Sequence, residues 1–381
     1  MTYTIEKVTT LIGARRYGDN DTNIGFILTD SRSLCFPEET LFFALKSERN
    51  DGHNYIPELY RRGVKNFVVT NVPKGYASDY PGANFLKVVN TLEALQRLAE
   101  RHRDEFNIPI VGITGSNGKT MVKERLYQLL SPSMFVTRSP RSYNSQIGVP
   151  LSVWLMNEQT QVGVFEAGIS MPGEMLALRD IIQPTIAVLT NLGAAHQENF
   201  SSMEEKCREK LILFHDAETV IYDGDDEVIS KVIAEYPDYK GEKLFWSLKN
   251  AEAPFYVKNI EKQQSVSVIT YIYKGVEDSF SIPFIDDASV QNAIISAVVA
   301  SKLGLSAEDI DKRMAQLEPV AMRLEVKVGQ HGCTLINDSY NSDINSLDIA
   351  LDFMNRRPDH RGRRHTLILS DIYQSGQAPE V

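Results

Sequence analysis

The sequence predicts an α/β fold in which a central parallel sheet is covered by helices, within a chain of three domains. Two observations carry this prediction. From residue 108 onward, short apolar runs alternate with helical patterns, and a repeated strand–helix unit is typical of a parallel sheet. A glycine-rich stretch, VGITGSNGKT at residues 111–120, stands between one apolar run and the helix that follows it. With 381 residues the chain is long enough for two or three cores.

The composition is that of an ordinary globular protein, with 43% hydrophobic and 24% charged residues. A net charge of −10 argues against a nucleic acid partner, because contact with a phosphate backbone needs a basic surface. Cys35, Cys207 and Cys333 are far apart and show no C-x-x-C spacing, which suits a reducing compartment. The N-terminus lacks the apolar core of a signal peptide, and no run reaches transmembrane length. We therefore expect a cytoplasmic protein without membrane insertion.

Three domains are expected, with boundaries before residue 107 and before residue 318. Residues 1–106 alternate short strands with helices. Residues 107–317 form the central domain, with an antiparallel β insertion within 254–283. Residues 318–381 begin a further strand–helix–strand unit that is short for a domain with its own core, so we expect this domain to be incomplete. The expected strands are 25–28, 41–44, 66–70, 108–114, 161–165, 185–190, 265–273, 279–283, 333–336 and 366–369, and the expected helices are 56–62, 119–130, 203–214, 290–303 and 346–353.

The glycine-rich stretch is interpreted as a phosphate-binding loop. Its backbone N–H groups, at Gly115 to Gly118, can approach phosphate oxygens, and the helix that follows adds its positive N-terminal end. Lys119 would neutralise phosphate charge, and the Thr120 hydroxyl would bind Mg²⁺. The general pattern has a glycine seven places before the final Ser/Thr, whereas this sequence has Ile113 there. The alternative is a glycine-rich turn before an ordinary helix, but the adjacent lysine and threonine favour phosphate.

Polar residues also follow the next two strands of the central domain. Glu166 ends one strand, at the place where nucleoside triphosphatases carry the carboxylate that holds magnesium. Asn191 and His196 follow another strand. Because ligands bind beyond the carboxyl ends of parallel strands, these side chains are expected at one shared site. Most charges of the 203–214 helix are expected to be solvated, with Lys210 as the exception.

Five motifs, in this order, resemble the Mur ligase family of peptidoglycan synthesis: GITGSNGKT, SYNSQIGVPLS, FEAGIS, TNLGAAH and LINDSYNSDINSL. The resemblance implies a UDP-sugar domain, a central ATP-binding domain and a Rossmann-like C-terminal domain. The stretches 144–148 and 338–341 favour the family member that joins D-Ala-D-Ala to UDP-MurNAc-tripeptide. The third residue of that tripeptide, diaminopimelate or lysine, is left open.

The resemblance also implies roles for individual residues. Lys119 and the loop residues Gly115, Ser116, Asn117 and Gly118 would bind the phosphates of ATP. Two Mg²⁺ ions are implied, one held by Thr120 and Glu166 and a second by His196 with Lys210, which some members carry as a carbamate. Lys119, His196, Lys210 and Arg323 form the implied catalytic set. The remaining implied contacts are Asn292 with adenine, Arg323 with the γ-phosphate, Asp338 with ribose, and Asp30, Ser31, Arg32, Lys46, Gly52, His53, Asn144, Ser145, Tyr340 and Asn341 with the substrates. Asp286 and Ala288 depart from the Gly and His that usually precede the adenine contact.

The implied reaction is ATP-driven amide-bond formation through an acyl phosphate. Three alternatives remain from the residues: another amide ligase such as folylpolyglutamate synthase, a P-loop phosphotransferase or motor-type ATPase, and a nucleotide-binding scaffold with little activity. Some family members are fused to an alanine racemase, so a fused or associated racemase is a further partner to consider. Nothing within residues 1–381 predicts a pyridoxal-phosphate site. With a short C-terminal domain, we expect this chain alone to bind nucleotide and UDP-sugar but to ligate poorly.

Overall fold

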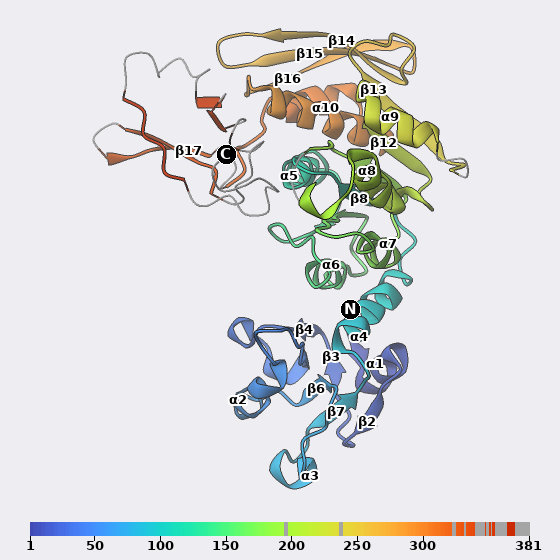
Figure 1. Ribbon diagram of the computed structural model, residues 1–381, viewed down its shortest axis with the longest axis vertical. Coiled ribbons are helices and arrows are strands. Elements are labelled where there is room, and N and C mark those ends of the chain that lie inside the picture. Colours follow the sequence, from blue (N-terminus) through green and yellow to red (C-terminus); the bar gives the residue numbers. More distant parts are fainter. Residues whose placement is uncertain are drawn as a thin grey trace. The chain divides into compact units, whose positions relative to one another are not determined.

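The computed structural model describes residues 1–193, 197–235, 239–321, 325–330, 333–339, 347, 350–351, 353–354 and 364–369. The chain forms two compact units, and each contains more than one stretch of sequence. Unit 1 consists of Met1–Ile108, Tyr143–Thr160 and Asp180–Ile182. Unit 2 consists of Pro109–Ser142, Gln161–Arg179 and Gln183–Val381. The colours of Figure 1 follow these stretches along the sequence.

Unit 1 is built on a five-stranded sheet in the order β2-β7-β6-β5-β4. Four of these strands are parallel, and β2 pairs antiparallel with β7 at one edge. A separate two-stranded sheet is formed by β1 and β3, which pair antiparallel. The strands are β1 (Tyr3–Thr4), β2 (Arg15–Tyr17), β3 (Asn23–Ile24), β4 (Phe26–Leu28), β5 (Thr40–Phe43), β6 (Asn66–Val69) and β7 (Asn84–Lys87), and the helices are α1 (Ile5–Ile12), α2 (Ile56–Arg61), α3 (Tyr76–Asp79), α4 (Thr91–Arg103) and α6 (Gly148–Val153).

Both faces of this sheet are buried, because alternate residues of each strand point to opposite sides. Leu41 and Phe43 of β5 pack into one core together with residues of α1 and α4. Phe42, between them, packs into a second core with residues of α2. The four consecutive buried positions of β5 and of β6, the central strands, are therefore what a two-sided sheet requires.

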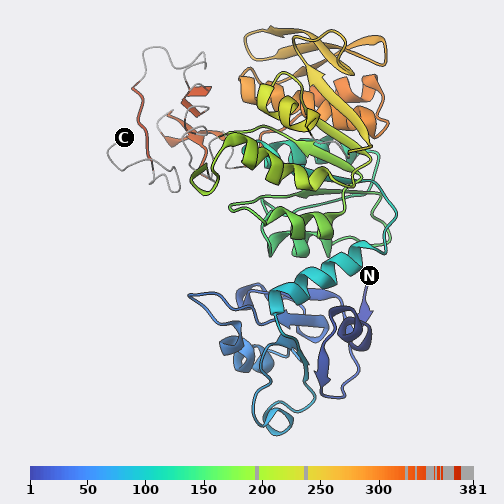
Figure 2. The ribbon, with the colours of Figure 1, turned by 45° about the vertical axis from the view of Figure 1, so that its right-hand side comes forward.

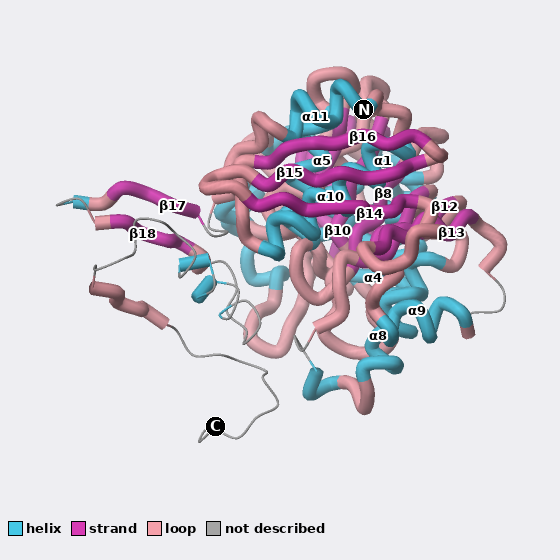
Figure 3. The backbone as a smooth tube through the Cα atoms, turned by 90° about the horizontal axis from the view of Figure 1, so that it is seen from above, coloured by secondary structure: helices cyan, strands magenta, loops and turns pink. Residues whose placement is uncertain are grey.

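Unit 2 is built on a sheet of nine described strands in the order β16-β15-β14-β13-β12-β11-β8-β10-β9. The strands from β14 to β9 run parallel, and β15 and β16 add antiparallel pairs at one edge. Figure 3 shows β14, β15 and β16 as neighbouring strands. The strands are β8 (Ile110–Thr114), β9 (Val136–Arg138), β10 (Val162–Glu166), β11 (Ile186–Leu189), β12 (Thr219–Asp223), β13 (Glu242–Ser247), β14 (Phe255–Lys262), β15 (Ser267–Tyr273) and β16 (Val276–Ile282).

The main core of unit 2 lies between this sheet and two long helices. Apolar residues of α5 (Lys119–Leu130) and α10 (Asp287–Lys302) pack together with those of the strands. Figure 2 shows the orange α10 directly beside the yellow strands β14 to β16. The other helices of unit 2 are α7 (Met175–Ile182), whose last residues count with unit 1, α8 (Met203–Leu211), α9 (Glu227–Ala234) and α11 (Ala307–Met314).

Most expected elements are present, two differ, and one lies largely outside the described residues. The antiparallel strands expected within 254–283 exist, but they extend the parallel sheet instead of forming a separate insertion. The expected strand at 366–369 is not a strand: Leu367, Ile368 and Leu369 are exposed, and no described strand pairs with them to satisfy their backbone groups. The helix expected at 346–353 lies largely outside the described residues. Near it, β17 (Glu325–Val328) and β18 (Thr334–Asn337) form an antiparallel pair.

The segment 143–160 belongs to unit 1 because of a buried polar cluster. The Tyr3 hydroxyl lies 2.9 Å from His102 Nδ1, and His102 Nε2 lies 3.1 Å from the Met156 carbonyl. Since a carbonyl only accepts, Nε2 carries the ring proton and Nδ1 accepts from Tyr3. The Trp154 ring packs against the His102 ring at 4.7 Å, and its Nε1 donates to the Gly25 carbonyl at 3.0 Å. A neutral imidazole satisfies both contacts, and burial disfavours the protonated form.

Unit 1 is therefore expected to lose stability in mild acid. Burial lowers the pKa of His102 to about 4, from an ordinary value of 6.5. Because the unfolded chain takes up this proton first, the stabilisation is present above pH 6.5 and is lost as the pH falls from about 6.5 toward 4. We expect about 2 kcal/mol of unfolding free energy to be lost between pH 7 and pH 5. Urea unfolding of a Trp246→Phe variant, followed by Trp154 fluorescence, measures it.

The control is the same experiment with His102→Gln added. Glutamine can hydrogen-bond at this position but does not titrate, so its unfolding free energy should change less between the two pH values. Equal pH dependence with and without His102 would show that another group is responsible.

Candidate functional site

The glycine-rich loop follows the carboxyl end of β8, which lies between β10 and β11 in the unit 2 sheet. β8 ends at Thr114, the loop follows, and α5 begins at Lys119. β8 pairs with β10 on one side and β11 on the other, so the carboxyl ends of the three strands meet there. Gly118 precedes α5 and gives it no side-chain cap. The first N–H groups of the helix are thus left for an anion.

The segment that follows β11 holds the loop in place. Thr190 Oγ1 donates to the Asn117 carbonyl at 2.5 Å, and Asn117 N donates to Asn191 Oδ1 at 2.9 Å. Ser116 N donates to the Asn191 carbonyl at 3.1 Å, and Ser116 Oγ accepts from Gly193 N at 2.9 Å. These contacts fix the path of the loop from outside, as a binding loop needs. The sequence placed Asn191 at this edge but gave no role to Thr190.

Two glycines of the loop have a conformation and surroundings that a side chain would disturb. Gly115 has a φ of 144°, and a Cβ there would lie 1.9 Å from Thr190 Oγ1. Gly118 has a φ of 84°, and a Cβ there would lie 2.5 Å from Asn292 Oδ1. The second contact also locates Asn292: it lies on α10, mostly buried, directly beside the end of the loop.

Three lysine ammonium groups lie around the loop. Lys119 Nζ donates to the Gly115 carbonyl at 2.7 Å and to the Ser116 carbonyl at 3.1 Å. Lys210 Nζ donates to the Gly115 carbonyl at 3.3 Å, and Lys206 Nζ to the Gly193 carbonyl at 2.5 Å. Burial, followed by repulsion from Lys119 and Lys206, moves the pKa of Lys210 well below its ordinary value. Basic side chains gathered in this way suit a multiply charged anion, whose charge would offset their mutual repulsion.

Lys206 corrects one sequence expectation. It was grouped with the solvated charges of its helix, yet only 1% of it is exposed. Lys206 and Lys210 are four residues apart on α8 and therefore share a helix face. The four-residue spacing of the two lysines is visible in the sequence, but whether that helix face points to solvent or to the protein interior is not.

Oxygen donors gather next to the lysines. Thr120 Oγ1 donates to Glu166 Oε2 at 3.1 Å and lies 2.7 Å from Ser142 Oγ. Glu166 is fully buried at the end of β10. A hydroxyl and a carboxylate beside a phosphate site suit Mg²⁺, which takes few protein ligands and completes its shell with phosphate oxygens and water. Among the described residues there is no group of three or more His, Cys, Asp or Glu side chains with metal-binding geometry.

Lys123 is a buried member of the site that the sequence did not single out. It lies on α5, one turn after Thr120, and none of its side chain is exposed. Its Nζ is 3.1 Å from Glu166 Oε1 and 3.0 Å from Glu124 Oε1. It also donates to the Ser139 carbonyl at 2.9 Å and to the Arg141 carbonyl. The available signal was its place on the apolar face of the helix, beside Val122 and Leu126.

In unit 1, three predicted substrate residues lie on one exposed turn. Asp30 caps the short helix of Ser31 and Arg32 by accepting from Arg32 N at 3.0 Å. The Arg32 guanidinium also pairs with Asp30 at 2.7 Å, which lowers the pKa of Asp30 to about 2. Arg62 Nη1 donates to the Ser31 carbonyl at 2.8 Å. The turn holds a charged, solvent-facing pair.

Three further predicted residues lie in the 46–53 loop. Lys46 forms an isolated bridge with Asp51, and their side chains approach to 3.8 Å. Gly52 N donates to the Leu45 carbonyl at 2.7 Å. Thr70 N donates to His53 Nε2 at 3.1 Å, so Nδ1 carries the proton given to Asp51 at 2.6 Å. Both nitrogens of His53 thus hold the loop together.

Asn144 and Ser145 belong to unit 1 as well. Ser145 Oγ accepts from Gly148 N at 3.2 Å, at the start of α6. Gln96 Nε2 on α4 donates to Gln146 Oε1 at 2.9 Å. The structure thus brings these two residues into the same unit as Asp30 and Lys46, although more than 90 positions of sequence separate the two groups.

Four predicted residues lie outside the described residues: His196, Arg323, Tyr340 and Asn341. Asp338 is described and directly follows β18. Its side chain is partly buried.

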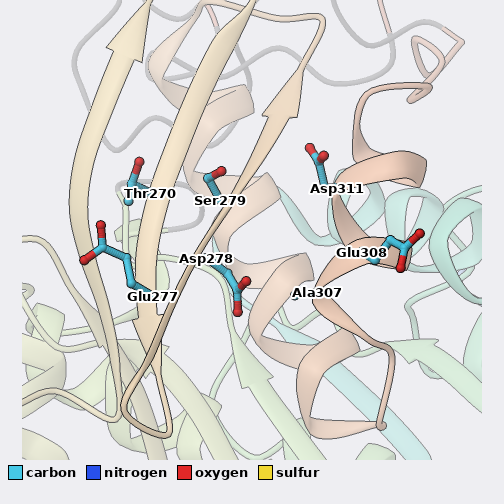
Figure 4. Close-up of a pocket in the computed structure, with 7 residues that line it drawn as sticks. All are labelled: Thr270, Glu277, Asp278, Ser279, Ala307, Glu308 and Asp311. Atoms are coloured by element: carbon cyan, nitrogen blue, oxygen red, sulfur yellow. The ribbon is translucent and has the colours of Figure 1, made fainter.

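A separate hollow of 570 Å³ lies at β15, β16 and α11. Figure 4 shows Glu277 and Asp278 on the strands and Glu308 and Asp311 on the helix. Thr270, Ser279 and Ala307 complete its lining. Four carboxylates would repel a phosphate, so this hollow is unsuited to the ligand that the loop fits.

Comparisons with known proteins agree with the geometry. The sequence model of the Mur ligase middle domain matches residues 113–300. The UDP-N-acetylmuramoyl-tripeptide–D-alanyl-D-alanine ligase of Bacillus subtilis is 29% identical over 367 residues, covering 94% of this chain and 76% of its own length. The crystal structure of MurF from Acinetobacter baumannii superposes with a TM-score of 0.84 at 24% identity, covering 94% of this chain and 77% of the other. MurF of Thermotoga maritima in complex with ADP gives 0.74 at 24% identity, covering 91% and 75%.

The Gly115 position is tested by substitution with alanine. Gly115→Ala must accommodate both a positive φ and a collision with Thr190, so we expect a loss of about 3 kcal/mol in the stability of unit 2. Gly275→Ala is the matched control: its φ of 77° is also positive, but no heavy atom lies within 4 Å of the new Cβ. It should cost about 1 kcal/mol.

Both variants are measured by urea unfolding in a Trp154→Phe background, so that Trp246 reports on unit 2. Equal losses in the two variants would show that the contact with Thr190 is unimportant.

Proposed function

The chain belongs to the Mur ligase family, and we propose that it is an ATP-dependent ligase that joins D-Ala-D-Ala to UDP-MurNAc-tripeptide. The observation that carries this proposal is the single edge of the unit 2 sheet where three lysines, an uncapped helix and a hydroxyl–carboxylate pair converge. This edge suits a triphosphate with its magnesium ion. The ligase of B. subtilis carries the reaction in its name.

The chemistry begins with an anionic carboxylate and an anionic triphosphate, which repel each other. In the proposed reaction the tripeptide carboxylate attacks the γ-phosphorus, so that an acyl phosphate forms and ADP leaves. The D-Ala-D-Ala amine then attacks the acyl carbon, and the tetrahedral intermediate expels phosphate as the nitrogen loses a proton. Lys119 would neutralise the transferred phosphoryl group. A magnesium ion on Thr120 and Glu166 would supply further charge stabilisation when bound.

Asn292 and Lys210 complete the proposed nucleotide end of the site. Asn292 lies beside Gly118 and would contact the adenine. Lys210, buried and adjacent to the loop, would react as a neutral amine with CO₂ to give a carbamate anion and a proton. With His196, that anion would hold a second cation near the tripeptide carboxylate. Arg323 and Asp338 are proposed to reach the γ-phosphate and the ribose from the C-terminal region.

Unit 1 is the proposed site of UDP-MurNAc-tripeptide. Asp30, Ser31, Arg32, Lys46, Gly52 and His53 come from its loops, and Asn144 and Ser145 join the same unit. Tyr340 and Asn341 are proposed to meet the substrates from the C-terminal region. A separate unit of this kind argues against the folylpolyglutamate synthase alternative, because a pteridine substrate does not need a UDP-sugar domain. The helices that the structure describes include none with the length and apolar character to cross a bilayer.

The test is phosphate release from ATP by the full chain. Because this chain alone is expected to ligate poorly, we expect slow release that requires both UDP-MurNAc-tripeptide and D-Ala-D-Ala, with the amide product identified by mass spectrometry. Release that depends on neither substrate would contradict the ligase proposal. Ligation without added racemase would also show that no alanine racemase is needed for the reaction.

Substitutions at the loop separate phosphate chemistry from general damage. Lys119→Ala and Glu166→Gln are each expected to lower kcat/KM by on the order of 10²-fold or more, because each removes charge stabilisation from phosphoryl transfer. Lys258→Met is the matched control, since it removes an exposed lysine that pairs with Glu277 on the surface of β14 and β16. Steady-state kinetics measures all three. Undiminished turnover in Lys119→Ala would rule out the proposed phosphate site.

A further inference from the structure

The two oxygens of the Glu166 carboxylate have different partners. Oε2 accepts from Thr120 at 3.1 Å, on the side of the proposed metal site. Oε1 lies 3.1 Å from the Lys123 ammonium, on the far side. Both residues are fully buried, so water does not screen this pair. Lys123 thereby fixes the plane of the carboxylate and leaves one oxygen for a cation.

Lys123 is itself held rigidly. Its ammonium is shared among Glu166, Glu124 and two main-chain carbonyls. Glu124 is held in turn by Arg138, whose guanidinium lies 3.0 Å from it and 3.5 Å from the centre of the Tyr127 ring. Each of the two carboxylates thus has a basic partner of its own. The pairs Lys123–Glu166 and Arg138–Glu124 bring no net negative charge to the site.

Little of the charge of Glu166 is therefore left to attract a cation when no nucleotide is bound. Lys123 offsets that charge, and Lys119 lies on the neighbouring loop. A free divalent cation would meet one neutralised carboxylate close to a basic side chain, which is unfavourable. A triphosphate reverses the sign of the local charge and supplies further oxygen ligands.

We propose that Lys123 is a positioning residue that couples metal binding to nucleotide binding: it aims one Glu166 oxygen at the metal position and cancels the charge that would otherwise attract a free cation. The cation then enters as the nucleotide complex. This inference rests on the proposed function, which gives Thr120 and Glu166 to the magnesium of the nucleotide.

The test uses Mn²⁺ as the probe and electron paramagnetic resonance to count free ions, with the full chain in the presence and absence of a non-hydrolysable ATP analogue. Wild-type protein should bind Mn²⁺ weakly alone and much more tightly with the analogue. Lys123→Met should bind Mn²⁺ alone more tightly, by on the order of tenfold, because the cancelling charge is gone. The increase in Mn²⁺ affinity of Lys123→Met on adding the analogue should be correspondingly smaller than that of wild-type protein. Lys123→Arg keeps the charge and should retain most of the wild-type coupling.

Glu124→Gln is an independent variant that should change the Mn²⁺ affinity in the opposite direction to Lys123→Met. The Glu124 side chain is 19% exposed, so this substitution puts folding less at risk. It removes one partner of Lys123 and should weaken binding of Mn²⁺ alone. Circular dichroism verifies that each variant is folded. If Lys123 had a purely structural role, every variant would bind Mn²⁺ more weakly, both with and without the analogue, and no variant would bind it more tightly.

Two outcomes separate the two proposals. If wild-type protein binds Mn²⁺ equally with and without the analogue, the proposed nucleotide–metal site is wrong, and the role of Lys123 falls with it. If wild-type coupling is strong but Lys123→Met and Glu124→Gln both leave Mn²⁺ binding unchanged, the inference about Lys123 alone is overturned.

Discussion

The alignment of three parallel strands, β10, β8 and β11, determines where everything in the candidate site lies. Glu166 is level with Ile113, and Leu189 is level with Thr114. One residue further along each strand, the chain leaves the sheet on the same side. Without this register the glycine loop, the buried carboxylate and the anchoring segment at Thr190 would not be neighbours. A slip of one residue in a strand would also turn its side chains to the opposite face.

Main-chain carbonyls accept hydrogen bonds from the buried basic side chains of the site. Lys119, Lys206 and Lys210 each donate to carbonyls of the loop or of the segment beside it. Arg125, fully buried under α10, follows the same rule through the Ser289 carbonyl at 2.5 Å. These carbonyls give the buried basic groups hydrogen-bond acceptors while keeping them next to the loop. Several basic side chains are therefore held where an anionic ligand can reach them.

The sequence was sufficient to place Lys119, Thr120 and Glu166 at one shared edge, because apolar runs show where strands end and the carboxyl ends of parallel strands lie on the same side of the sheet. Helix 119–130 was predicted with its observed limits. Lys123 and Lys206 were not predicted as site residues, because a charged residue on a helix is usually solvated and only tertiary packing shows which helix face is covered. The membership of residues 143–160 in unit 1 was also missed. It depends on where Trp154 and Met156 pack, and the apolar pattern of α6 fits either unit equally well.

The return of the chain to unit 1 has a consequence for how the protein is made. The ribosome delivers β1 and α1 first, yet the Trp154 side chain that covers Tyr3 and His102 comes roughly fifty residues after α4 ends. During that interval the nascent chain must keep an apolar surface of unit 1 open while it begins the first strand of unit 2. The core of the N-terminal unit therefore cannot close before the first strands of unit 2 have been synthesised.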